Sequence, residues 1–244
     1  MVKESLQVVV RKVEKCLYPL LEKYRHKGAY VATALAALIL VILAINIFVE
    51  LTETLTTEML GTYDQSITQY VLSFRSPRLT NFFLFMTNVG DLEGYLTILG
   101  IMVPLTAIVF KKWKYVGQIC LVLFLASTSN LVLKRFINRA RPELEHMVSV
   151  ETLSYPSGHA MSAMAFYGFL IYLVYTFRLN KYLKSSLILL LILLILSIGI
   201  SRIYLGVHFP SDIAGGFIAG GIWVFLCVLL FNLVEVFRKD SETR

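Results

Sequence analysis

Six long apolar runs dominate the chain and limit what it can fold into. They cover residues 29–49, 94–110, 115–133, 160–177, 185–201 and 213–234. Each is close to the roughly 20 residues that a helix needs to cross about 30 Å of hydrocarbon. We therefore predict an all-α membrane protein, built as a six-transmembrane helical bundle. The apolar stretch 79–90 is too short to span and is predicted to be re-entrant or interfacial.

The composition supports a membrane protein and argues against a nucleic-acid-binding one. Hydrophobic residues make up 57% of the 244 residues and charged residues only 16%, which is far from an average soluble domain. The net charge of +7 comes from short basic clusters between the apolar runs and not from one basic domain. We expect no nucleic-acid partner.

The distribution of basic residues predicts how the bundle is oriented. If the N-terminus is cytoplasmic, 16 of the 23 Lys and Arg residues fall in segments 1–28, 111–114 and 178–184 and in the tail from Glu235. Cytoplasmic loops of membrane proteins carry such an excess. We expect a multi-pass protein of the cell membrane with both termini in the cytoplasm. The first apolar run is long enough to stay as a span, so no cleaved signal peptide is expected.

The N-terminal segment has a different character. Residues 5–22 place apolar side chains at helical spacing, with basic and acidic residues on the other faces. We predict a cytoplasmic amphipathic helix within 1–28 that lies in the inner-leaflet interface; packing against the bundle or a second subunit is the alternative. Residues 29–235 form one six-span domain and 236–244 a cytoplasmic tail. Cys16, Cys120 and Cys227 are expected to be free thiols, and the oligomeric state is left open.

Two cations and a proline follow one another at the end of the third predicted span. Lys134 ends that span, and Arg141 follows seven residues later, directly before Pro142. Seven residues are nearly two helical turns, so the two cations would share one face of a continuing helix. Pro142 disfavours helical geometry at Arg141, so we expect the helix to end there. This pattern favours an anion site.

A second polar cluster, Pro156-Ser157-Gly158-His159, comes immediately before the fourth predicted span. Ser157 is a candidate N-cap, and Gly158 allows the backbone to approach a ligand closely. The start of a helix offers unpaired N–H groups to an anion. We expect His159 in the first helical turn, at the membrane surface.

A third cluster joins the last two spans. Ser201 and Arg202 end the fifth, and His208 and Asp212 begin the sixth, where a helical turn would make them i, i+4 neighbours. A carboxylate beside an imidazole fixes its tautomer and stabilises its cation. All three clusters fall on the extracytoplasmic side of a topology derived from loop charges alone. Together they predict a site for a phosphoryl group and its transfer.

The clusters resemble the three signature motifs of the type 2 phosphatidic acid phosphatase family. The matching patterns are Lys134-x6-Arg141-Pro142, Pro156-Ser157-Gly158-His159 and Ser201-Arg202-x5-His208-x3-Asp212. No position departs from the family pattern. The resemblance covers about residues 29–235, with six spans as in the bacterial membrane members, and implies an integral-membrane lipid phosphatase.

The resemblance also implies a role for each motif residue. His208 attacks phosphorus and forms a phosphohistidine, Asp212 orients and supports it, and His159 protonates the leaving oxygen. The implied phosphate ligands are Lys134, Arg141, Arg202, Ser157 and the backbone N–H of Gly158. No metal and no other cofactor is implied, in agreement with a sequence that offers cations where a metal enzyme would place carboxylates.

The expected partner is a phosphorylated lipid taken from the bilayer. Undecaprenyl diphosphate, phosphatidylglycerol phosphate and phosphatidic acid all suit an outward-facing site, because the motifs bind phosphate and not the tail. A phosphotransferase with an alcohol or sugar acceptor is the alternative function. A transporter or channel is disfavoured, since it would place ionisable residues near the bilayer midplane.

Two further polar groups have simpler interpretations. Arg135 and Arg139 border the first motif but do not match its positions; attraction of anionic substrate or lipid headgroups is expected, with direct substrate contact as the alternative. Residues 127–130 form a polar patch in the third span. We expect it to make helix–helix hydrogen bonds, with a role in substrate entry as the alternative.

Overall fold

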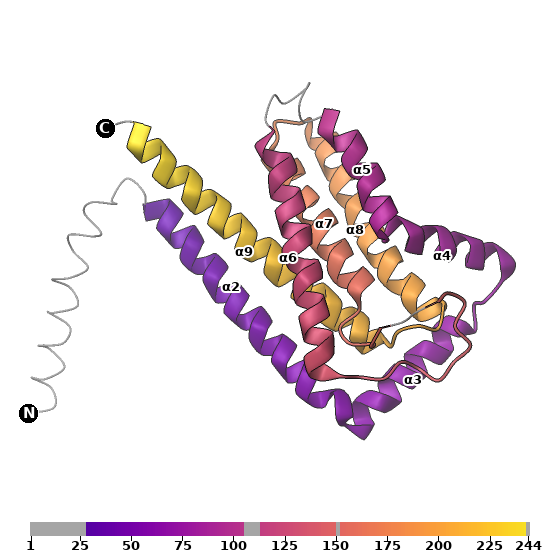
Figure 1. The fold of residues 1–244 in the computed structure, drawn as a ribbon. Helices are drawn as coiled ribbons and strands as arrows, with labels where there is room; N and C mark the ends of the chain where they lie inside the picture. The colour runs from indigo at the N-terminus through magenta and orange to yellow at the C-terminus, as the bar shows by residue number, and fades with distance from the viewer. Residues whose placement is uncertain (1–27, 105–112, 150–151, 243–244) are drawn as a thin grey trace, which may run out of the picture. The chain divides into compact units, whose positions relative to one another are not determined.

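The computed structural model describes residues 28–104, 113–149 and 152–242 of the chain (Figure 1). The chain divides into two compact units, Met1–Leu40 and Val41–Arg244. The described part of the first unit is helical. The second unit carries all three motifs.

All of the described secondary structure is helical. The elements are α2 (Gly28–Glu53), the short 3₁₀ helix η2 (Thr54–Thr56), α3 (Glu58–Leu72), α4 (Pro77–Val89), α5 (Leu92–Pro104), α6 (Lys114–Ile137), α7 (Gly158–Thr176), α8 (Lys181–Tyr204) and α9 (Pro210–Glu242).

Five of these helices are long and apolar enough to cross a membrane. They are Ala34–Thr56, Lys114–Ile137, Gly158–Thr176, Lys181–Tyr204 and Pro210–Glu235. They correspond to predicted spans one, three, four, five and six, and the chain is a multi-pass membrane protein. The second predicted span, 94–110, is described only as far as Pro104, so a sixth crossing stays a prediction. The amphipathic helix predicted for residues 5–22 lies outside the described residues.

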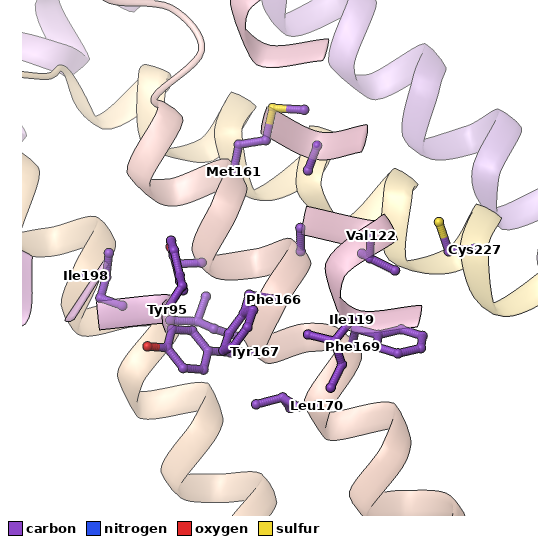
Figure 2. Close-up of a cluster of buried hydrophobic side chains, with 14 of the residues drawn as sticks. Tyr95, Ile119, Val122, Met161, Phe166, Tyr167, Phe169, Leu170, Ile198 and Cys227 are labelled. Carbon is purple, nitrogen blue, oxygen red and sulfur yellow. The ribbon is translucent and has the colours of Figure 1, made fainter. Parts of the chain in front are cut away.

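Helix α7 lies at the centre of the bundle, packed between α6, α8 and α9 (Figure 1). Its side chains dominate the largest hydrophobic core, where Phe166, Tyr167 and Phe169 meet Tyr95 of α5 and Ile119 of α6 (Figure 2). Half of α7 is buried inside the protein, the largest share among the five long apolar helices. Because Gly158 and His159 begin α7, this packing fixes the second motif within the bundle.

Glycines let α7 and α9 approach each other closely. A Cβ on Gly220 would lie 2.5 Å from the carbonyl oxygen of Met161, and one on Gly216 would lie 2.8 Å from the carbonyl oxygen of Ser157. Small residues at helix contacts allow backbones in membrane bundles to pack by direct contact. The close approach brings the starts of α7 and α9 together, and both carry motif residues.

No helix is predicted from the sequence over residues 58–72, where the structure has α3. The reason is that α3 is polar on its inner face: Asp64 and Thr68 are buried, whereas Met59, Tyr63, Ile67 and Tyr70 are exposed. Neither a spanning run nor a soluble amphipathic pattern describes such a helix. The apolar stretch 79–90, predicted to be re-entrant or interfacial, lies within α4 and its C-cap, Gly90.

The first motif is less helical than predicted. Helix α6 ends at Ile137, and Asn138 adopts a left-handed conformation with φ of 52°, so Arg141 lies in the following loop and not at a helix end. Asn is one of the few residues that tolerate this conformation, and it commonly ends a helix. Helix α9 continues to Glu242, so the predicted tail begins as helix. Within the described residues, Cys120 and Cys227 are free thiols, as predicted.

Candidate active site

His208 lies in a tight loop between α8 and α9. The carbonyl oxygen of Arg202 accepts hydrogen bonds from the amides of Val207 (3.1 Å) and His208 (3.3 Å). Gly206 makes this closure possible, because its φ of 78° lies in the region that side chains disfavour. A Cβ there would also lie 2.9 Å from the carbonyl oxygen of Glu145.

The two ring nitrogens of His208 have different surroundings. Nδ1 lies 3.4 Å from Oδ2 of Asp212 and 3.3 Å from Oγ of Ser154. Nε2 lies 3.3 Å from Nη1 of Arg141. The predicted proximity of His208 and Asp212 is present, although His208 precedes α9 and only Asp212 lies in its first turn. A proton on Nδ1, held by the carboxylate, leaves the lone pair of Nε2 facing the cation.

Burial lowers the pKa of His208 to about 3, although the hydrogen bond and negative charge of Asp212 oppose the shift. The side chain is only 2% exposed. The imidazole is therefore neutral at physiological pH and able to act as a nucleophile.

Asp212 is fully buried and held by groups from separate segments of the chain. Its Oδ2 accepts hydrogen bonds from Ser154 Oγ (2.5 Å) and the Phe209 amide (2.8 Å), in addition to the contact with His208. Its Oδ1 accepts a charged hydrogen bond from Nη1 of Arg139 (2.6 Å). A buried carboxylate needs such partners to remain ionised.

The second motif begins α7 as predicted. Ser157 is the N-cap, its side chain accepting a hydrogen bond from the amide of Ala160. The amide of Ser157 donates to the backbone oxygen of Asp212 at 3.0 Å, which joins the second and third motifs. Gly158 faces Asn130 of α6, where an added Cβ would lie 3.1 Å from the Asn130 Oδ1.

His159 contacts Asp91, directly before α5 (Leu92–Pro104). Its Nε2 lies 2.7 Å from Oδ1 of Asp91, an ion-pair distance. Burial raises the pKa of Asp91, yet the interaction with His159 and the charge of Arg202 outweigh burial and leave the pKa below its ordinary value. Asp91 is thus an anion that can support a protonated His159.

Three motif cations surround the same region from separate segments. Lys134 donates from Nζ to Thr152 Oγ1 at 2.8 Å, and Arg141 donates from Nη2 to the same oxygen at 3.3 Å. Arg141 also donates from Nη1 to the Val207 carbonyl at 2.6 Å, which holds it against the His208 loop. Arg202 donates to Thr87 of α4. One threonine hydroxyl therefore lies where two cations converge, as an anion's oxygen would.

An unpaired donor marks the site. Among the described residues, Nε of Arg202 is a buried side-chain nitrogen that lacks a hydrogen-bond partner. A buried donor of this kind requires an explanation. Arg202 is a motif residue, and this nitrogen suits an anionic ligand. Within the part of the chain that the structure describes, no group of three or more His, Cys, Asp or Glu side chains could hold a metal ion.

This arrangement has clear relatives among known proteins. A family model described as the PAP2 superfamily matches residues 115–234. The chain is 32% identical over 198 residues to phosphatidylglycerophosphatase B of Bacillus subtilis, covering 80% of this chain and 93% of that protein. The chain belongs to the PAP2 superfamily.

Two further comparisons support the PAP2 assignment. The crystal structure described as the first transmembrane PAP2 type phosphatidylglycerolphosphate phosphatase, from Bacillus subtilis, matches with a TM-score of 0.73 and 28% identity, over 80% of this chain and 96% of that one. A lipid A 1-phosphatase of Rhizobium etli is 30% identical over 129 residues, which is 46% of this chain and 51% of that protein.

The PAP2 motif residues do not account for the whole site. Five further side chains contact motif residues or their neighbours and are not predicted from the sequence: Asp64, Thr87, Asp91, Thr152 and Ser154. Asp64, Thr87 and Asp91 come from segments before residue 115 and carry no local signal. Arg139 had been noted for its charge, but it pairs with two carboxylates instead of facing an open anion site.

The polar patch of α6 makes helix–helix hydrogen bonds, as predicted. Ser127 Oγ lies 3.4 Å from Ser162 Oγ of α7, and Ser129 Oγ accepts from Trp223 Nε1 of α9 at 2.6 Å. Asn130 donates to the carbonyl of Pro156 at 3.0 Å, which supports the second motif from below. These bonds tie three helices together beneath the site.

Proposed function

We propose that this PAP2 protein is a lipid phosphatase that hydrolyses a phosphomonoester or diphosphate of a membrane lipid through a phosphohistidine at His208. The observation that carries the proposal is the setting of His208, which is buried, with Nδ1 held by Asp212 and Nε2 facing Arg141. This is the arrangement of an activated nucleophile. The relatives named above, which act on lipid phosphates, support the substrate class.

The reaction has two steps. Nε2 of His208 attacks phosphorus, an N–P bond forms, the P–O bond to the lipid breaks, and His159 donates a proton to the leaving oxygen. Water then attacks the phosphohistidine, His159 takes a proton from that water, the N–P bond breaks, and inorganic phosphate leaves. Lys134, Arg141, Arg202, Ser157 and the amide of Gly158 hold the phosphoryl oxygens. No metal takes part, since cations and helix-start amides stabilise the charge.

The site operates at the extracytoplasmic face. Basic loops on the opposite side of the bundle support this orientation, with both termini in the cytoplasm. A lipid whose headgroup stays in the outer leaflet reaches the site without crossing the hydrocarbon. Undecaprenyl diphosphate, phosphatidylglycerol phosphate and phosphatidic acid are the substrates that we propose to test.

A phosphate-release panel tests the proposal. Purified protein in detergent is given each of the three lipids, and His208→Gln serves as the matched inactive variant. We expect release from at least one lipid and a labelled phosphohistidine on acid-free quenching, both absent in His208→Gln. Release without a phosphoenzyme would rule out the covalent route. Transfer to an added alcohol or sugar in place of release would identify a phosphotransferase.

A further inference from the structure

The carboxylate beside the nucleophile is itself held by a second ion pair outside the family motifs. Arg139, in the loop after α6, donates from Nη1 to Asp212 Oδ1 at 2.6 Å and from Nη2 to Asp64 Oδ2 at 2.8 Å. Asp64 lies on α3, before the residues 115–234 that match the family model. One guanidinium therefore lies between two buried carboxylates from different helices.

Ser211 completes this cluster. Its amide and hydroxyl both donate to Asp64, at 2.9 Å and 2.5 Å, and its hydroxyl accepts from Arg139 Nη1 at 2.7 Å. Asp64 is thereby bound to the residue that directly precedes Asp212. We call Asp64, Arg139 and Ser211 the carboxylate clamp.

Arg139 is not placed to bind the phosphoryl group. Its Nη1 donates to Ser211 and Asp212, and its Nη2 donates to Asp64. Cζ of its guanidinium lies over the Phe209 ring, 4.5 Å from the centroid, and the side chain is only 15% exposed. By contrast, Arg141 approaches Nε2 of His208 directly. The two arginines of the first motif region have separate tasks.

The electrostatics explain why the clamp matters to Asp212. Without Arg139, the charges of Asp64 and Asp212 would face each other in a buried setting, and an uncompensated buried carboxylate is strongly unfavourable. The bond at Oδ1 also fixes the rotation of the carboxylate, so that Oδ2 stays directed at Nδ1 of His208. A planar guanidinium can hold two carboxylates at once, whereas an ammonium acts as a point charge.

We propose that Arg139, held by Asp64 of α3, is a positioning residue that fixes the charge and orientation of Asp212 and thereby of the nucleophile. This inference rests on the proposed function, since it assigns Asp212 to the support of His208. The residues that support the proposed active site would then include Asp64 of α3, a helix that contains none of the three motifs.

Steady-state kinetics on full-length protein in detergent tests the clamp. We expect Arg139→Gln to lower kcat by about 10- to 100-fold, the loss typical of residues that orient a functional group, with KM changed by less than about threefold. Arg78→Gln removes the same charge from an exposed position on α4 and should leave kcat unchanged. A kcat for Arg139→Gln within twofold of wild type would overturn the proposal.

A substitution at Asp64 tests the clamp independently, because asparagine has nearly the same shape as aspartate. Asp64→Asn should lower kcat in the same direction by a smaller factor, because Asn cannot pair with the guanidinium. In the Arg139→Gln background the further change should be below twofold, because Asp64 acts through Arg139. If the kcat losses of the two single variants multiplied in the double variant, Asp64 would not act through Arg139, which would contradict the proposal.

Chemical rescue separates positioning from folding. In Arg139→Ala, guanidinium ion at millimolar concentration should restore kcat several-fold, whereas urea, which has the same shape and no charge, should not. Rescue by both or by neither would overturn the clamp. The proposed function fails separately, if wild-type protein releases no phosphate or His208→Gln retains activity.

Discussion

Asp91 Oδ1 lies 2.7 Å from Nε2 of His159, so the start of α5 supplies a negative charge to the histidine that begins α7. We predict that Asp91→Asn lowers lipid turnover about tenfold, because the protonated form of His159 loses its partner. An activated aryl phosphate needs less protonation of its leaving oxygen and should lose less than about threefold. Glu93→Gln, a nearby acid of α5, is the control. Equal losses on both substrates would argue against a general-acid role for His159.

The low pKa of His208 predicts an unusual pH profile. Since burial lowers this pKa to about 3, the imidazole is neutral above that pH and remains a nucleophile at pH 5. An ordinary histidine with a pKa near 6.5 would be only about 3% neutral at pH 5. The rate of phosphoenzyme formation from an aryl phosphate should therefore change less than about threefold between pH 8 and pH 5. A fall of about 30-fold would show that the nucleophile titrates normally.

Metal removal and a phosphate analogue test the cationic site. Dialysis against EDTA should leave kcat within about twofold, because Lys134, Arg141 and Arg202 neutralise the phosphoryl charge. Vanadate should inhibit competitively, since it adopts the five-coordinate geometry of the transition state. A loss of activity that only a divalent cation restores would contradict the mechanism.

The close contact of α7 and α9 predicts different effects for two adjacent glycines. Gly220→Ala would place a Cβ 2.5 Å from the Met161 carbonyl oxygen, whereas the Cβ of Gly221→Ala would meet only the end of Met164 at 3.5 Å. Overpacking of about 1–3 kcal/mol should lower the Tm of Gly220→Ala by roughly 3–10 °C in detergent. Gly221→Ala should stay within about 2 °C of wild type. The same Tm for both variants would refute the packing argument.

Orientation is tested by thiol labelling in intact cells. In a variant without Cys16, Cys120 and Cys227, a cysteine at Ser149 should react with an impermeant maleimide, whereas one at Asn180 should not. Both positions are exposed, in loops on opposite sides of the predicted bundle. Labelling at Asn180 alone would reverse the topology and the proposed access from the outer leaflet.

Local patterns predicted the parts of the fold that depend on local chemistry. Run length alone predicted the five long helices, and the Ser157 N-cap followed from residue type and position. Helix α3 was missed because its inner face is polar, with Asp64 buried against Arg139 and Ser211. A periodic sequence pattern cannot predict a partner 75 residues away. Such pairings exist only once the helices have packed.

The same distinction holds for the site. The motifs placed His208, Asp212 and His159 in the right segments, because each motif is local in sequence. The supporting side chains could not be predicted, since Asp91, Thr152 and Ser154 are ordinary polar residues until the fold brings them to a motif. Charge alone gave Arg139 an interpretation as an anion attractor, whereas its actual partners are carboxylates.

The closed loop from Arg202 to His208 has a mechanical consequence. Two backbone hydrogen bonds to the Arg202 carbonyl join His208, the proposed nucleophile, and Arg202, a proposed phosphate ligand, in one short closed segment. Helices in a fluid bilayer tilt and shift against one another, and a displacement of about 1 Å at a reacting atom can slow a reaction about a hundredfold. Because His208 and Arg202 belong to the same closed segment, we expect such movements to change the distance between them less than the distances between separate helices.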